Sequence, residues 1–298
     1  MTGRTDGSEH RLLANHSARV VWRHNLPDLL GLPASGMDDA DSDSAGNVWV
    51  SSSATSRVLG FGPDSNVITA LDIPHGGRDD NWQAPSIATV SGDIYIADPA
   101  AETLSRYSER GEFLGVFAIS NILSICHGMD GTIYVLSNPS DIERIEVYDA
   151  LGMVSELPAP TRHSPILDPA FVKMDCDGAG NVYVSYGMAP YAVWRISADG
   201  DEIREIGREI DYPEDAVLVN DLAFDASAGI LWTLLACRGS GLQLVDAFTH
   251  GGRWLGALEL PQSENLFGVI CPSLDGDLYL LDTGTGPGSG DLIRITPS

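Results

Sequence analysis

The chain has 298 residues, and its 17 Lys and Arg stand against 42 Asp and Glu, which gives a formal net charge of −25. A charge of that sign repels polyanions, so we expect neither nucleic acid nor a membrane surface among its partners. The first 17 residues contain no apolar core of signal-peptide length, and no later run approaches the roughly 18 apolar residues of a membrane helix. The sequence therefore predicts a soluble, cytoplasmic protein.

The four cysteines are scattered and have no CxxC spacing; they are Cys126, Cys176, Cys237 and Cys271. Metal sites and redox centres in short motifs use closely spaced cysteines. This pattern favours buried free thiols over metal ligands, in a reducing compartment.

A five-residue pattern recurs six times along the chain: Gly, any residue, an aliphatic residue, an aromatic residue, and a β-branched residue or Leu. The copies are GNVWV at 46–50, GDIYI at 92–96, GTIYV at 131–135, GNVYV at 180–184, GILWT at 229–233 and GDLYL at 276–280. Their glycines are 46, 39, 49, 49 and 47 residues apart, the length of a four-stranded propeller blade. Alternating apolar and polar residues around each copy are typical of half-buried strands joined by tight turns.

The two ends of the chain complement each other. The last repeat stops after its third strand, DLIRITPS at 291–298, while an unpaired strand, RVVWRHNL at 19–26, precedes the first repeat. Pairing of these two segments would close the ring and remove an exposed sheet edge. We therefore predict an all-β, six-bladed propeller of four-stranded blades as a single domain over 18–298, with a disordered tail over 1–17.

The second repeat, PSIATVSGDIYIADPAAETLSRYSERGEFLGVF, resembles an NHL repeat. The six-copy ring is similar to the wider group that holds gluconolactonases, strictosidine synthase-like proteins and virginiamycin B lyase. The resemblance covers nearly the whole chain from Arg19 onward. It implies the propeller fold, but that group includes hydrolases, lyases, condensing enzymes and binding scaffolds, so it does not select one activity.

One segment, VNDLAFD at 219–225, resembles the NGLAFD-type inner strand of gluconolactonase-like propellers, in which the Asn binds a catalytic divalent metal. Asn220 matches that Asn. Asp38 and Asp39, in the loop before the first repeat, would add the oxygen ligands that Ca²⁺ or Mg²⁺ prefers. The competing interpretation is that the Asp-rich stretch is a solvated loop and that Asn220 caps a turn. Where that family has further ligands, this chain has Pro85, Ala170 and Phe267.

In a propeller the loops that lead into the innermost strands surround a central funnel, and two kinds of residue there suit acid–base catalysis. Asp221 begins an inner strand, where burial would raise its pKa toward that of a usable base. His163, with Asp168 nearby in sequence, and His75 could act as the complementary acids. The alternative is that both are ordinary loop histidines.

Two loops carry residues suited to an apolar or aromatic ligand: DDNWQAP at 79–85 and SYGMAPYA at 185–192. Aromatic rings give a large contact area with little loss of rotamer freedom. Packing between blades is the alternative role for them. The predicted ligand-binding residues are Trp82, Tyr186, Met188, Tyr191 and Asn220.

No GxSxG, HExxH or Walker motif occurs, which argues against the common serine hydrolases, zincins and P-loop enzymes. We expect an enzyme that acts on a small organic ligand by non-redox acid–base chemistry, as a cyclase, lyase or hydrolase. The alternative is a non-catalytic NHL-type scaffold that binds a protein.

Overall fold

The computed structural model describes residues 18–26, 37–53, 55–64, 66–73, 85–128, 130–139, 143–160, 172–187, 193–207, 217–237, 243–260, 267–283 and 290–297. Within these ranges the side chains of residues 22, 24, 217, 237 and 259 are not described. The predicted tail over 1–17 lies outside the described residues and stays a prediction.

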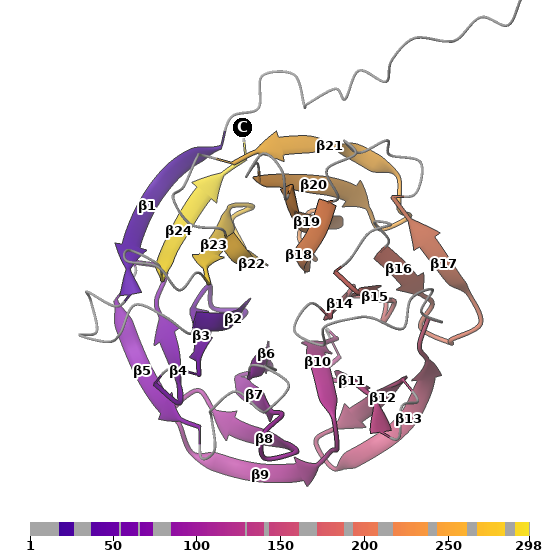
Figure 1. Cartoon of the computed structure of the whole chain (residues 1–298). Coiled ribbons are helices and arrows are strands. Elements are labelled where there is room, and N and C mark those ends of the chain that lie inside the picture. Colours follow the sequence, from indigo (N-terminus) through magenta and orange to yellow (C-terminus); the bar gives the residue numbers. More distant parts are fainter. Residues whose placement is uncertain are drawn as a thin grey trace, which may run out of the picture.

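Within the described ranges, twenty-four strands form six antiparallel four-stranded sheets that surround a central axis as blades (Figure 1). The first three blades, each from its innermost to its outermost strand, are β2(Met37–Ser42), β3(Val48–Ser52), β4(Arg57–Phe61) and β5(Val67–Asp72); β6(Ser86–Val90), β7(Asp93–Asp98), β8(Thr103–Ser108) and β9(Phe113–Ala118); β10(Ile122–His127), β11(Ile133–Ser137), β12(Arg144–Asp149) and β13(Gly152–Pro158). The last three are β14(Lys173–Cys176), β15(Val182–Ser185), β16(Val193–Ile196) and β17(Ile203–Ile206); β18(Val217–Asp225), β19(Ile230–Cys237), β20(Gln243–Thr249) and β21(Trp254–Glu259); β22(Phe267–Pro272), β23(Leu278–Asp282), β24(Asp291–Thr296) and β1(Arg19–Asn25). The predicted six-bladed, all-β propeller is confirmed.

The last three or four residues of each copy of the pattern begin the second strand of a blade. All five residues of β3 and of β11 are buried, because a second strand packs against neighbouring blades on both faces. The glycine that starts each copy lies in the preceding turn; Gly46, for example, has a φ of +81°, in the left-handed region that favours glycine. The pattern thus supplies the glycine of the turn and buried residues of the strand that follows it.

The chain ends close the ring as predicted. β1 pairs antiparallel with β24, with Arg19 opposite Thr296 and Asn25 opposite Asp291. The buried Asp291 carboxylate accepts a hydrogen bond from Asn25 Nδ2 at 2.9 Å and forms an ion pair with Arg23. The first strand of the chain is therefore the outermost strand of the last blade (Figure 1).

Side-chain carboxylates on the innermost strands join neighbouring blades. A carboxylate of one blade accepts a hydrogen bond from a backbone N–H of the next blade's inner strand, 48 or 49 residues later in the chain. These inter-blade hydrogen bonds join Asp39 to Ile87, Asp41 to Thr89, Asp175 to Phe224 and Asp221 to Ile270. They satisfy amides on the inner edges of three of the sheets, those of β6, β18 and β22, where no further strand pairs.

Among the described residues, none belongs to a helix of the length and apolar character that crossing a membrane requires.

Candidate functional site

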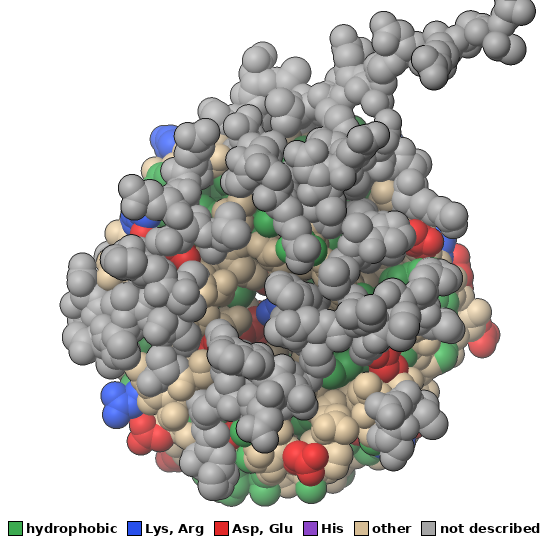
Figure 2. Space-filling view, viewed as in Figure 1, with side chains coloured by type: hydrophobic (Ala, Val, Ile, Leu, Met, Phe, Trp, Pro, Cys, Tyr) green, Lys and Arg blue, Asp and Glu red, His purple; other side chains and the backbone are tan. Residues whose placement is uncertain are grey.

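A cavity of about 330 Å³ lies on the axis, and residues of all six innermost strands line it. Its lining runs from the middle of those strands to the turns that follow them, such as Ser44, Gly178 and Ser227. It therefore reaches the face on which the inner strands end, opposite the loops that lead into them. In the space-filling view the centre of the ring is hollowed, and basic and acidic side chains are visible inside (Figure 2).

Lys173, Asp39 and Asp221 share one level of this cavity. Lys173 is the only lysine of the chain, and it begins β14. Asp221 lies on β18, the inner strand of the next blade, and Asp39 lies on β2. The two carboxylates exert the strongest favourable electrostatic effects on Lys173, ahead of Asp38. One cation therefore faces two acidic side chains within the cavity, where Asp221 is buried and Lys173 and Asp39 are half-buried.

Burial sets the protonation of this group. Desolvation raises the pKa of Asp221 to about 7; Lys173 opposes the shift, and Asp39 adds to it. Desolvation likewise raises the pKa of Asp39, again against the effect of Lys173. Burial alone would lower the pKa of Lys173, yet the carboxylates reverse that effect and raise it. Lys173 thus favours the ionised form of both carboxylates, whereas desolvation favours the protonated form of both.

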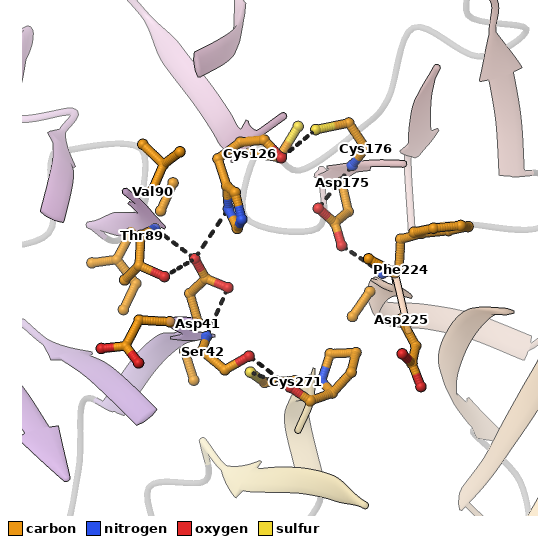
Figure 3. Close-up of a pocket in the computed structure, with 18 of the residues that line it drawn as sticks. Asp41, Ser42, Thr89, Val90, Cys126, Asp175, Cys176, Phe224, Asp225 and Cys271 are labelled. Carbon is orange, nitrogen blue, oxygen red and sulfur yellow. Dashed lines mark hydrogen bonds and ion pairs between the residues drawn. The ribbon is translucent and has the colours of Figure 1, made fainter. Parts of the chain in front are cut away.

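A second set of titratable residues lies further along the channel: Asp41 and Asp175 follow Asp39 and Lys173 by two residues on β2 and β14, a rise of about 7 Å. Nδ1 of His127, on β10, lies 3.4 Å from Oδ2 of Asp41, on β2 (Figure 3). Asp41 also accepts hydrogen bonds from the backbone N–H and the hydroxyl of Thr89. Asp175 lies on β14, and burial raises its pKa to about 7. The cavity thus has a Lys–Asp level and a His–Asp level.

Six of the sequence-predicted site residues lie outside the described residues, and their roles stay predictions. They are His75, Trp82, His163, Asp168, Met188 and Tyr191.

The structure brings Asp39 and Asp221 together at the cavity, although the sequence assigned them to different roles. The other described candidates have contacts of their own. Asp38 accepts a hydrogen bond from the backbone N–H of Ser53 at 2.5 Å. Asn220 donates through Nδ2 to the carbonyl of Phe267 at 2.9 Å, toward the next blade.

Tyr186 is buried between the third and fourth blades, and 7% of its surface is exposed. Its hydroxyl donates a hydrogen bond to the carbonyl of Pro160 at 3.1 Å. This position matches the blade-packing role that the sequence left open for the loop aromatics.

The sequence did not place Lys173, His127 and Asp175 at the cavity, although all three line it. Each is a charged or titratable residue within a short inner strand whose other residues are mostly apolar or small. A buried ionisable residue is costly unless it is paired, so such a residue in an inner strand is itself a signal.

The cysteines match the sequence prediction in part: Cys126, Cys176 and Cys271 are free and buried. Two of them have a carboxylate beside them. The ligand atoms of Cys126, Asp175 and Cys176 all lie within 4.8 Å of one another, at the edge of the cavity between the third and fourth blades.

No family model and no curated protein matches the sequence. The fold, by contrast, matches solved structures over almost their whole length. Virginiamycin B lyase from Staphylococcus aureus is similar at 14% identity and a TM-score of 0.62, over 95% of this chain and 100% of that one. PQQ-bound aldose sugar dehydrogenase from Streptomyces coelicolor is similar at 15% identity and a TM-score of 0.62, over 96% of this chain and 99% of that one.

A luciferin-regenerating enzyme is similar at 11% identity and a TM-score of 0.61, over 92% of this chain and 95% of that one. Identities this low establish a common fold and no more. The chain has the six-bladed propeller fold that these enzymes share.

Proposed function

We propose that this protein is an enzyme that acts on a small organic molecule by non-redox acid–base chemistry in its central cavity. The observation that carries the proposal is the level formed by Lys173, Asp39 and Asp221. A carboxylate and a carboxylic acid that face one cavity near neutral pH supply a general base and a general acid. The cavity volume of about 330 Å³ suits a small ligand.

The reaction class follows from that pair. The ionised carboxyl of Asp39 or Asp221 removes a proton from the substrate or from an attacking water, and the protonated one donates to the departing oxygen. Lys173 stabilises the negative charge that develops on an oxygen. This supports a lyase or a hydrolase; cyclisation by the same proton transfers is the third member of the class. The propeller enzymes with the same fold, a lyase among them, are consistent with this proposal.

The carboxylates also have a structural role, which the test must separate from catalysis. Asp221 accepts a hydrogen bond from the Ile270 N–H, and Asp39 accepts one from the Ile87 N–H. Asp221→Asn retains an acceptor oxygen for the Ile270 amide but cannot transfer the proton. Ser124→Ala is the matched control, because Ser124 Oγ accepts the Met174 N–H between the third and fourth blades without being titratable.

The test is proton release from a panel of lactones, cyclic depsipeptides and aryl esters, followed in a pH-stat, since both lactone elimination and ester hydrolysis liberate an acid. We expect turnover of at least one class. Asp221→Asn should lower kcat by about a hundredfold or more, and Ser124→Ala should leave it within a few-fold. No proton release from the whole panel, or equal kcat in wild type and Asp221→Asn, would contradict the proposal.

A second candidate, the non-catalytic scaffold, has one observation in its favour. Exposed apolar side chains gather on the outermost strands of the second and third blades: Phe113, Leu114 and Val116 on β9, and Met153 and Val154 on β13. Exposed apolar patches are typical of docking sites for a protein partner. Under this function Leu114→Lys would abolish partner binding while Asp221→Asn would leave it unchanged.

A further inference from the structure

We propose that Cys126, Cys176 and Asp175 form a binding site for a thiophilic divalent cation of the zinc class, which joins the third and fourth blades at the wall of the channel. Two sulfur atoms and a carboxylate oxygen within 4.8 Å of one another need only a small contraction to bind one ion. In tetrahedral zinc sites the metal lies about 2.3 Å from sulfur and 2.0–2.2 Å from carboxylate oxygen.

The position of the Asp175 carboxylate completes the cluster. Consecutive side chains of a strand point to opposite faces, so Asp175 and Cys176 would ordinarily diverge. Here Asp175 Oδ1 turns back to accept the Cys176 backbone N–H at 2.8 Å, while Oδ2 accepts the Phe224 N–H at 2.5 Å. Both hydrogen bonds come from backbone groups and fix the carboxylate in place. Such fixed outer partners orient the ligands in metal sites.

The two thiols come from different blades and meet in the interface between them. Cys126 lies on β10 and Cys176 on β14, and both belong to the buried cluster that packs these blades together (Figure 3). Cys176 Sγ donates a hydrogen bond to the His127 carbonyl at 2.7 Å. Binding of the ion replaces the thiol protons, which leave to solvent through the channel that the cluster lines.

The ligand chemistry selects the class of metal. Thiolate ligands favour Zn²⁺ and other soft or borderline ions, whereas Ca²⁺ and Mg²⁺ bind oxygen ligands. This site differs in residues and in preference from the hard-cation site that Asn220, Asp38 and Asp39 would form. Three protein ligands leave the fourth position of a tetrahedral ion facing the channel, an arrangement found in catalytic zinc sites. The proposal does not depend on the acid–base role of Asp221.

The test uses the full-length protein, chelated and kept reduced, with Co²⁺ alone as the probe. We expect one equivalent of Co²⁺ to produce the intense sulfur-to-cobalt charge-transfer absorption of a thiolate site, and Zn²⁺ to displace it. Cys126→Ser and Cys176→Ser should abolish this absorption. Asp175→Asn should retain it but weaken Co²⁺ affinity by at least roughly tenfold.

Cys271→Ser is the matched control, because Cys271 is a third buried, free cysteine on an inner strand of the same channel and lies outside the cluster. It should bind Co²⁺ as the wild type does. The proposal is overturned if no charge-transfer absorption develops, if the absorption survives in both serine variants, or if Cys271→Ser loses it equally. X-ray absorption of the zinc-loaded wild type needs no variant: two sulfur neighbours at about 2.3 Å support the site, and a shell of only nitrogen and oxygen overturns it.

Discussion

The carboxylate of Asp221 on β18 accepts a hydrogen bond at 2.9 Å from the backbone N–H of Ile270 on β22, the inner strand of the next blade. The same residue lines the cavity beside Lys173. Asp221 therefore links blade assembly to the chemistry of the channel, and the two roles can be separated by choice of substitution.

Asp221→Ala should destabilise the protein more than Asp221→Asn does. Ile270 is 2% exposed, so alanine leaves its N–H buried without an acceptor, which costs about 1–3 kcal/mol, whereas asparagine retains an acceptor oxygen. Urea unfolding below pH 6, where the wild-type carboxyl is protonated, measures the difference. Equal losses in the two variants would show that this hydrogen bond does not stabilise the ring.

The stability of the wild type should fall with rising pH where Asp221 titrates. Its pKa is raised from 3.8 to about 7 in the folded state, so between these values the folded protein holds a proton that the unfolded chain releases. The free energy of unfolding therefore decreases as pH rises through this window. Asp221→Asn has no such proton, so the stability of the wild type relative to this variant should decline across a pH series that spans the window. A constant difference would contradict the raised pKa.

Asp291→Ala should loosen the closing strand. The residue is 4% exposed, and its carboxylate binds both Arg23 and Asn25 of β1, so its loss should cost about 1–3 kcal/mol. Limited proteolysis should then cut within residues 19–26 faster than in the wild type. Arg57→Ala is the control: its ion pair with Asp72 at 3.0 Å is exposed on the outer strands, and its loss should cost less than about 1 kcal/mol.

Gly252→Ala tests the contact between the fourth and fifth blades. Gly252 has a φ of +78°, and a Cβ there would lie 2.3 Å from Cγ2 of Ile206 on β17. Gly229→Ala is the control, because Gly229 also has a positive φ, +65°, but a Cβ there meets nothing within 4 Å. Backbone strain of about 1–2 kcal/mol is common to both variants. Gly252→Ala should lose about 1–3 kcal/mol more because of the clash, which a thermal melt detects as a lower Tm.

The fold could be predicted from the sequence because each blade repeats the same local pattern. The turn at the glycine of GDIYI is visible in the local sequence, and the unpaired strand RVVWRHNL is found by counting strands. Closure of β1 on β24 followed from one missing and one surplus strand, and the structure confirms it.

The channel site could not be predicted in the same way. Asp39, Lys173 and Asp221 lie seven, seven and eight residues before the glycine of their own repeats, so they are near-equivalent in sequence. They meet, however, only because the ring turns each blade toward one axis, which no local pattern specifies. The resemblance at 219–225 directed attention to Asn220, whose amide contacts a carbonyl of the next blade, and the adjacent Asp221 lines the cavity. Desolvation, which raises the pKa of Asp221 as the sequence suggested, depends on the strands of several blades that surround it.

The pairing of β1 with β24 also determines when the molecule can finish folding. Asn25 and Asp291 are 266 residues apart in sequence, so β1 leaves the ribosome long before the strand with which it pairs. Contacts of such long sequence separation slow folding, because the intervening chain must first be ordered. Until translation passes residue 296, the edge of β23 and the whole of β1 lack their partner, and the nascent ring is then most exposed to aggregation through open strand edges.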